Sequence, residues 1–152
     1  MIIEHVSFLK SLDECIALVQ EHRDELATYK DVMALNPDRE RYKELEDAGR
    51  LKTLVLRDDD NKIVGYSVLV FSRSLHYKDL SLATNDVIYV RKDLRNTGWG
   101  LKLLGETEVA AREFFDGQPF MMMFHAKKDT ALIDLMPKLG YAVQDVIYSK
   151  IF

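Results

Sequence analysis

The fold is decided by one stretch of the sequence, Asp86-Val-Ile-Tyr-Val-Arg-Lys-Asp-Leu-Arg95-Asn-Thr-Gly98-Trp-Gly100-Leu-Lys-Leu-Leu104. An apolar strand leads into a turn that contains one arginine and two glycines, and an amphipathic helix begins directly after it. The first amides of a helix have no partner inside the helix, and this end carries a partial positive charge. The layout is therefore typical of a turn that binds a pyrophosphate.

Two better-known phosphate-binding patterns do not fit this turn. A dinucleotide fingerprint would need glycine at Leu103, and a Walker loop would need Gly-Lys-Ser/Thr. What remains is Arg95-x-x-Gly98-x-Gly100 at the start of a helix that follows a strand. Glycines there let the backbone approach a ligand closely. The alternative interpretation is a plain strand-to-helix turn.

Composition limits the class of protein. The chain has 152 residues, of which 47% are hydrophobic and 30% are charged, so we expect residues 1–152 to form a single globular domain. The formal net charge is −4, and no basic run exceeds two residues, which argues against a nucleic-acid partner.

The sequence also bears on the compartment. It has one cysteine, Cys15, so it cannot form an intramolecular disulfide, and this fits a reducing compartment. No stretch has the pattern of a signal peptide or of a membrane-spanning helix. We therefore expect a cytoplasmic protein with no membrane partner.

Hydrophobic periodicity and turn residues predict an α/β (α+β) chain. Strands are predicted at 2–8, 51–57, 63–73, 80–91, 120–124 and 141–152, and helices at 11–29, 38–48, 98–115 and 130–138. Ser11 and Glu14 fit a capping box at the start of the first helix. The second helix is strongly charged and is interpreted as a solvated face. This order predicts a mixed, mostly antiparallel sheet of six to seven strands with helices on both faces.

A second motif closes the last helix, Pro137-Lys138-Leu139-Gly140-Tyr141. Together with the turn and the element order, it resembles the GNAT family of acyl-CoA N-acyltransferases over nearly the whole chain. The resemblance implies the GNAT fold and transfer of an acetyl group from acetyl-CoA to a primary amine, by direct attack in a ternary complex and without a metal. Leu75-His76-Tyr77, the segment 85–90 and Tyr148-Ser-Lys150 also resemble small GNATs of phages and prophages.

The resemblance assigns residues to acetyl-CoA. In the family the R/Q-x-x-G-x-G/A turn cradles the coenzyme A pyrophosphate, and the preceding strand offers a backbone N–H to the oxyanion. Many members also have an asparagine near the last helix, where this chain has an aspartate. The implied cofactor-binding residues are Ile88, Tyr89, Val90, Arg95, Asn96, Thr97, Gly98, Trp99, Gly100 and Asp129.

The implied reaction needs a base, because an alkyl ammonium group has a pKa of about 10.4 and must lose a proton before it attacks. Strand alternation predicts that Thr84, Asp86 and Ile88 share one face. Some GNATs have a glutamate or a tyrosine as the base where this chain has Thr84, and threonine cannot serve as a base. The resemblance therefore implies that Asp86 takes this role. The alternative for Asp86 is a carboxylate that caps a turn.

Two further residues are catalytic candidates. His125 follows the apolar strand 120–124, where some GNATs that acetylate protein N-termini have a histidine base. The alternative is a hydrogen-bonded histidine at a strand edge. Tyr77, in the loop before the strand that carries Asp86, either lines the acceptor pocket or packs against its neighbours.

One departure from the family weakens the catalytic interpretation. Many GNATs have a tyrosine as general acid where this chain has Met136, and a thioether cannot donate a proton. The alternative function is therefore a catalytically impaired GNAT-fold protein that binds acyl-CoA or regulates. The expected acceptor is a small-molecule amine or a protein amine. The final strand, with its edge at 146–152, would allow a homodimer.

Overall fold

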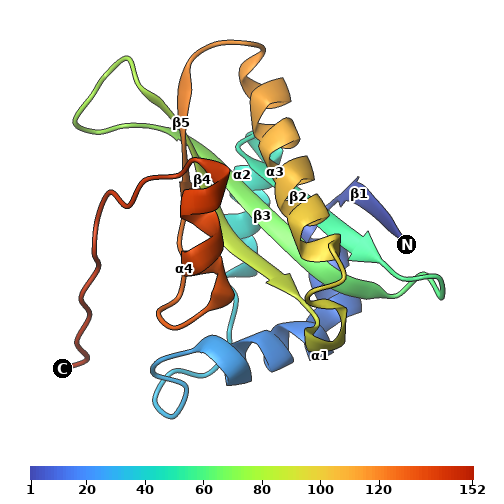
Figure 1. The fold of residues 1–152 in the computed structure, drawn as a ribbon. Coiled ribbons are helices and arrows are strands. Elements are labelled where there is room, and N and C mark those ends of the chain that lie inside the picture. Colours follow the sequence, from blue (N-terminus) through green and yellow to red (C-terminus); the bar gives the residue numbers. More distant parts are fainter.

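The computed structural model describes residues 1–152, which form one sheet with the strand order β1-β2-β3-β4-β5 (Figure 1). The strands are β1 Ile2–Val6, β2 Leu51–Arg57, β3 Ile63–Arg73, β4 Ser81–Val90 and β5 Phe120–Phe124. Neighbours from β1 to β4 are antiparallel, and β5 runs parallel to β4. The predicted mixed, mostly antiparallel α/β sheet is confirmed, but it has five strands and not six to seven.

Helices cover both faces of this sheet, as predicted. They are α1 Phe8–Leu26, α2 Arg39–Asp47, α3 Trp99–Phe115 and the short α4 Ala131–Leu135. Strand alternation decides which residues meet which helix. On β2, Leu54 belongs to the apolar cluster with Leu103 of α3, whereas Val55 belongs to the cluster with Cys15 and Leu18 of α1.

The start of α1 differs from the prediction. The helix begins at Phe8, and Ser11 lies buried inside it, where its hydroxyl donates to Phe8 O at 2.8 Å. The predicted capping box is therefore wrong. Glu46 of α2 does the capping instead, because its carboxylate accepts from the Phe8 amide at 2.8 Å and from the Ser7 hydroxyl at 3.0 Å.

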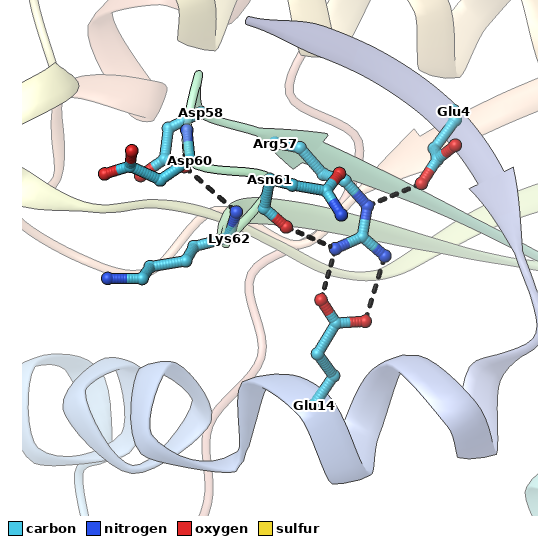
Figure 2. A network of polar contacts seen from close by, with 7 residues as sticks. All are labelled: Glu4, Glu14, Arg57, Asp58, Asp60, Asn61 and Lys62. Atoms are coloured by element: carbon cyan, nitrogen blue, oxygen red, sulfur yellow. Dashed lines mark hydrogen bonds and ion pairs between the residues drawn. The ribbon is translucent and has the colours of Figure 1, made fainter.

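Glu14, the other half of the predicted capping box, binds a buried arginine (Figure 2). The Arg57 guanidinium donates to Glu4 Oε1 at 2.5 Å, to Glu14 Oε2 at 2.9 Å and to the Asn61 carbonyl at 2.9 Å. Such charge-assisted bonds are stronger than neutral ones. This one side chain therefore ties β1, α1 and the turn between β2 and β3 together.

A β-bulge interrupts β4 at its middle. Asn85 pairs with Leu69 and Val87 pairs with Val68, so Asp86 is an extra residue in β4. A bulge shifts the alternation of side chains beyond it. Ile88 consequently packs toward α3, while Val87 packs toward α1, so the predicted common face of Thr84, Asp86 and Ile88 is wrong for Ile88.

The buried side chain of Asn85 holds this bulge. Its amide nitrogen donates to Ser67 Oγ at 2.9 Å and to the carbonyls of Val68 and Val87, both at 3.1 Å. Thr107 of α3 also donates to Ser67 Oγ, at 3.0 Å. A buried polar chain thus fixes the irregular part of β4 against α3.

The predicted final strand, 141–152, does not form. This segment has no regular structure and runs away from the sheet (Figure 1), and its apolar side chains, such as Tyr148 and Phe152, are exposed. A strand needs a neighbour for its hydrogen bonds. The tail instead contacts the rest of the protein through side chains, because the Tyr141 hydroxyl donates to Glu108 at 2.8 Å and the Tyr29 hydroxyl donates to Ser149 O at 2.7 Å. The sheet therefore ends at β5, and the expected dimer edge on the final strand is absent.

Candidate functional site

The predicted phosphate turn joins β4 to α3. After a short 3-10 turn, Lys92–Leu94, the backbone takes left-handed values at Asn96 (φ 65°) and Gly98 (φ 89°), and α3 starts at Trp99. The first helical bond runs from Lys102 N to Gly98 O, and the amides of residues 96–101 make no hydrogen bond within the protein. A row of free amides at a helix N-terminus is suited to binding an anion.

The glycines of the turn leave the space beside these amides open. A Cβ added at Gly98 would meet no atom within 4 Å, and one added at Gly100 would meet only Val90 Cγ2, at 3.9 Å. Packing within the protein therefore does not require a glycine at Gly100. Gly98 is required by its positive φ. The backbone at both glycines is therefore open to close approach by a ligand.

Arg95 is engaged inside the protein. Its Nε donates to Val90 O at 2.9 Å, and its two terminal nitrogens donate to the Glu25 carboxylate at 2.6 and 2.8 Å. These hydrogen bonds lower the pKa of Glu25 to about 2. Arg95 thus anchors the turn to the last turn of α1, and the backbone amides, rather than this guanidinium, remain free for a phosphate.

The strand before the turn has an open edge. Pairing of β4 with β5 ends at Asn85 and Phe124, but β4 continues to Val90. Arg91 N donates to Val64 O, and antiparallel ladder bonds alternate, so the amides of Ile88 and Val90 point away from β3. The Ile88 N–H therefore faces the gap where the two strands separate.

Asp86 and His125 lie at the mouth of this gap. Each directly follows the last residue of its strand that takes part in the β4–β5 pairing, and both are exposed. The Tyr42 hydroxyl donates to Asp86 Oδ2 at 2.6 Å, and burial raises the pKa of Tyr42, so this hydroxyl keeps its proton. His125 has no hydrogen-bond partner among the side chains. Because the β4–β5 pairing ends at Asn85 and Phe124, the structure brings the two candidate bases to one place.

Sequence reasoning missed Tyr42, because it lies in the charged helix interpreted as a solvated face. Its ring stacks on Phe8 of α1 with a centroid distance of 3.9 Å, and its hydroxyl reaches across to β4. A signal was present, since Tyr42 is the one aromatic residue of α2.

The structure does not bring Tyr77 to this place. Its side chain is 68% exposed on the β3–β4 loop, which projects from the opposite end of β4 from the phosphate turn (Figure 1). Asp129 is exposed just before α4, 4.0 Å from the Lys128 ammonium, and has a φ of 61°. Met136 is buried.

A cavity of about 390 Å³ lies on the α1 face of the sheet. Its walls are α1, the segment 27–37 that follows α1, and α2, and strands β2, β3 and β4 form its floor. The floor residues are Thr53, Tyr66, Val68 and Val87. Tyr42 and Val87 also line the cavity, and both adjoin Asp86, so this carboxylate lies at the border of the cavity. We call it the acceptor cavity, after the ligand that we propose for it.

A polar network connects the acceptor cavity with the phosphate turn. His22 lines the cavity, bonds the Tyr66 hydroxyl through Nδ1 at 2.7 Å and stacks on Tyr89 at 4.5 Å. Burial lowers the pKa of His22. The Tyr89 hydroxyl donates to Glu25 at 2.9 Å, and Glu25 holds Arg95 in the turn. The acceptor cavity and the phosphate turn are therefore connected through these hydrogen bonds and stacked rings.

Two other kinds of site are absent from the structure. No three side chains of histidine, cysteine, aspartate or glutamate come together as they would around a metal ion. None of the helices combines the length and the apolar character that crossing a membrane requires.

A comparison with known protein families identifies the family of the chain. The profile of the acetyltransferase (GNAT) family matches residues 17–141, which include the phosphate turn, Asp86 and His125. The chain belongs to this family, as the resemblance of its turn and its last helix predicted. No curated protein matches the sequence.

Solved structures share the fold at low sequence identity. The tetramutant of the BH1408 protein from Bacillus halodurans is 15% identical, with a TM-score of 0.74 and 100% of both chains covered. A ribosomal-protein-alanine N-acetyltransferase from Brucella melitensis is 18% identical, with a TM-score of 0.67 and 100% of both chains covered. The aminoglycoside acetyltransferase meta-AAC0020, from an uncultured soil metagenomic sample and in complex with sisomicin, is 21% identical, with a TM-score of 0.67 over 99% of this chain and 95% of that one.

Proposed function

We propose that this protein is an acetyl-CoA-dependent N-acetyltransferase that acetylates a primary amine by direct attack in a ternary complex. The observation that carries the proposal is the row of free amides at residues 96–101, which lies next to the open edge of β4. A helix N-terminus binds the phosphates, and an open strand edge next to it can bind the amide-containing arm of coenzyme A. The acetyl-CoA-binding residues remain those assigned from the resemblance, with Arg95 acting as an anchor.

In the proposed reaction, Asp86 or His125 first takes one proton from the substrate ammonium group, directly or through a water. The neutral nitrogen then forms a bond to the acetyl carbon, and the Ile88 N–H donates to the oxygen that becomes negative. The carbon–sulfur bond breaks, and the coenzyme A thiolate takes the second proton of the nitrogen. The products are the acetamide and coenzyme A, and one proton goes from the base to solvent.

Tyr42 serves in this proposal as a positioning residue. Its hydroxyl holds one oxygen of Asp86 at 2.6 Å, so the other oxygen is left for the amine. Tyr42→Phe should lower kcat with little change in the affinity for acetyl-CoA. An unchanged kcat would show that this hydrogen bond has no part in catalysis.

Binding of acetyl-CoA is tested with two glycines of the same helix. Alanine at either helical position should stabilise the fold by up to about 1 kcal/mol. Gly100→Ala places a methyl group over the free amides, and we expect it to weaken acetyl-CoA binding at least about tenfold, or about 1.4 kcal/mol. Gly105→Ala, whose Cβ also meets no atom within 4 Å, is the control. Equal affinities of the two variants in calorimetry would contradict the pyrophosphate assignment.

The base is identified from rates of coenzyme A release as a function of pH. Loss of a general base typically costs about 10²–10⁴ in rate. Asp86→Asn and His125→Ala should therefore separate the two candidates, since only the variant that lacks the base loses the acidic limb of the profile. If both variants retain the wild-type profile, neither residue is the base.

A second candidate function is acyl-CoA binding without transfer. Met136 favours it, because a buried thioether stands where many GNATs have their general acid. Tight binding of acetyl-CoA with no transfer to any amine would select this candidate. A single catalytic domain over residues 1–152, a cytoplasmic location, a homodimer, a kinship with phage-type members and roles for Tyr77 and Asp129 stay predictions.

A further inference from the structure

The acceptor cavity has a mainly apolar lining. Fourteen of its 22 lining residues are hydrophobic, and they come from α1, the segment after it, α2 and the sheet floor. Apolar contact area of this kind favours a ligand with an apolar body, since the binding free energy grows with the apolar surface removed from water. The cavity is therefore unlike a site for a highly hydrated acceptor.

The charged residues around the cavity also disfavour a polycationic acceptor. Its lining contains no aspartate and no glutamate, but it contains Arg23, Lys30 and Lys127. Arg23 is paired with Asp24, whereas Lys127 has no carboxylate partner. A polyamine or an aminoglycoside carries several ammonium groups and would meet cations without compensating carboxylates, which is unfavourable. Asp86, at the border, offers a carboxylate to a single ammonium group.

One polar atom on the floor of the cavity has no partner. Thr53 Oγ1 is the single buried side-chain oxygen or nitrogen of the protein without a hydrogen bond, and Thr53 is 3% exposed. A buried hydroxyl without a partner is costly, and a ligand group that bonds to it removes that cost. Ser11 lines the same cavity, but its hydroxyl is already bonded to Phe8 O at 2.8 Å.

We propose that the acceptor is a small monoamine with an apolar, ring-sized body and one hydrogen-bonding group that meets Thr53, and that polycationic amines are excluded. This inference rests on the proposed function for its reaction, but the binding of the amine does not depend on catalysis. The ammonium group lies at Asp86, the apolar body lies in the cavity, and the hydrogen-bonding group lies on the floor.

The test uses four amines as probes, namely tyramine, phenethylamine, spermidine and kanamycin. Tyramine and phenethylamine differ by one hydroxyl group. With acetyl-CoA present, kcat/KM for release of coenzyme A should be at least about tenfold higher for both arylalkylamines than for the two polycations, a difference of about 1.4 kcal/mol. Calorimetry without acetyl-CoA should give the same order of affinities.

Thr53→Val removes the hydroxyl and keeps the shape of the side chain. We expect it to abolish the preference for tyramine over phenethylamine. The thermal midpoint should not fall, because the hydroxyl has no partner in the protein and its burial is costly. Ser11→Ala is the matched control and should keep the preference for tyramine.

The outcomes separate the two proposals. A preference for spermidine or kanamycin would overturn the inference and leave the acetyltransferase proposal intact. Binding of tyramine without transfer to any amine would overturn the proposed function and support the inference. If neither arylalkylamine binds or reacts, or if Thr53→Val keeps the preference for tyramine, the inference is wrong.

Discussion

The phosphate turn and the acceptor cavity are built in opposite ways. The turn is one continuous piece of chain, and its ligand-binding groups are backbone amides that the side chains only shape. The cavity combines side chains from two helices, two loops and three strands. A backbone site persists through many sequence changes, whereas a side-chain site changes with each one. We infer that the turn defines the class of reaction and the cavity defines the acceptor.

The two regions are not independent, because one ion pair connects them. Glu25 belongs to α1, which forms a wall of the cavity, and its carboxylate holds both terminal nitrogens of Arg95 in the turn. The same carboxylate accepts from Tyr89, which stacks on His22 at the cavity wall. Substitutions in the turn, in the sheet and in this ion pair should therefore have separable effects.

The largest effect is expected from Gly98→Val, which should weaken acetyl-CoA binding at least about 100-fold, or about 2.7 kcal/mol. A side chain at a φ of 89° costs about 1–2 kcal/mol and displaces the free amides. Gly140→Val has the same backbone strain at a φ of 88°, away from the turn, and is the control. Equal affinities of the two variants in calorimetry would contradict the proposal that the turn binds acetyl-CoA.

Asn85→Ala is expected to destabilise the protein by about 2–3 kcal/mol, because two buried acceptors and one partly buried acceptor lose their donor. Since the bulge positions Asp86, transfer should also fall while acetyl-CoA affinity stays within about threefold, or about 0.7 kcal/mol. Denaturant unfolding and calorimetry measure the two effects. Thr84→Ala, on the same strand, should change stability by less than about 1 kcal/mol. A large loss of acetyl-CoA affinity in Asn85→Ala would show that the turn depends on the bulge.

Glu25→Gln should cost about 1 kcal/mol at neutral pH, because Arg95 is 37% exposed and solvent weakens the pair. The pKa of Glu25 is lowered to about 2 in the folded protein, so the ion pair stabilises the fold above about pH 4.5 and this contribution is lost as the pH falls toward 2. The difference between wild type and variant should therefore shrink at pH 3 in denaturant unfolding.

The control for this change is Glu21→Gln. Glu21 lies on the same helix and accepts from the same Tyr89 hydroxyl at 3.1 Å, but it holds no arginine. We expect a change below about 0.5 kcal/mol. A difference between wild type and Glu25→Gln that stays constant from pH 7 to pH 3 would contradict the assigned ion pair.

The smallest effect is expected from Thr97→Ala, inside the turn itself. The Thr97 hydroxyl donates to Leu94 O at 2.5 Å and is exposed. Removing it should cost no more than about 1 kcal/mol of stability, and acetyl-CoA affinity should change less than about threefold. A larger loss of affinity would mean that side chains of the turn, and not only its amides, bind the ligand.

Most elements of the fold were predictable, because their determinants are local. The glycine turn before α3 and the apolar strand 120–124 lie where the sequence predicts them. Errors arose where a distant residue decides the outcome. The N-terminus of α1 is capped by Glu46, thirty-eight residues away from Phe8, and the tail 141–152 has no neighbouring strand with which to pair.

The candidate site likewise has parts that the sequence predicts and parts that depend on tertiary contacts. Asp86 and His125 were predicted separately, but the register of β4 and β5 is what brings them together. The bulge that exposes Asp86 depends on the buried contacts of Asn85, and the hydroxyl that holds Asp86 comes from Tyr42 in another helix. Alternation along one strand cannot reveal an extra residue, because a bulge is a property of two paired strands.

The sequence by itself determined the family, the position of the phosphate turn and the set of candidate bases. These follow from glycines, caps and hydrophobic periods that act over a few residues. Only the tertiary structure decided that Arg95 is an anchor, that Tyr42 holds Asp86, and that an apolar cavity with the unpartnered Thr53 hydroxyl lies next to them. The physical reason is that burial and partner choice depend on which distant segments pack together, and local sequence does not specify that packing.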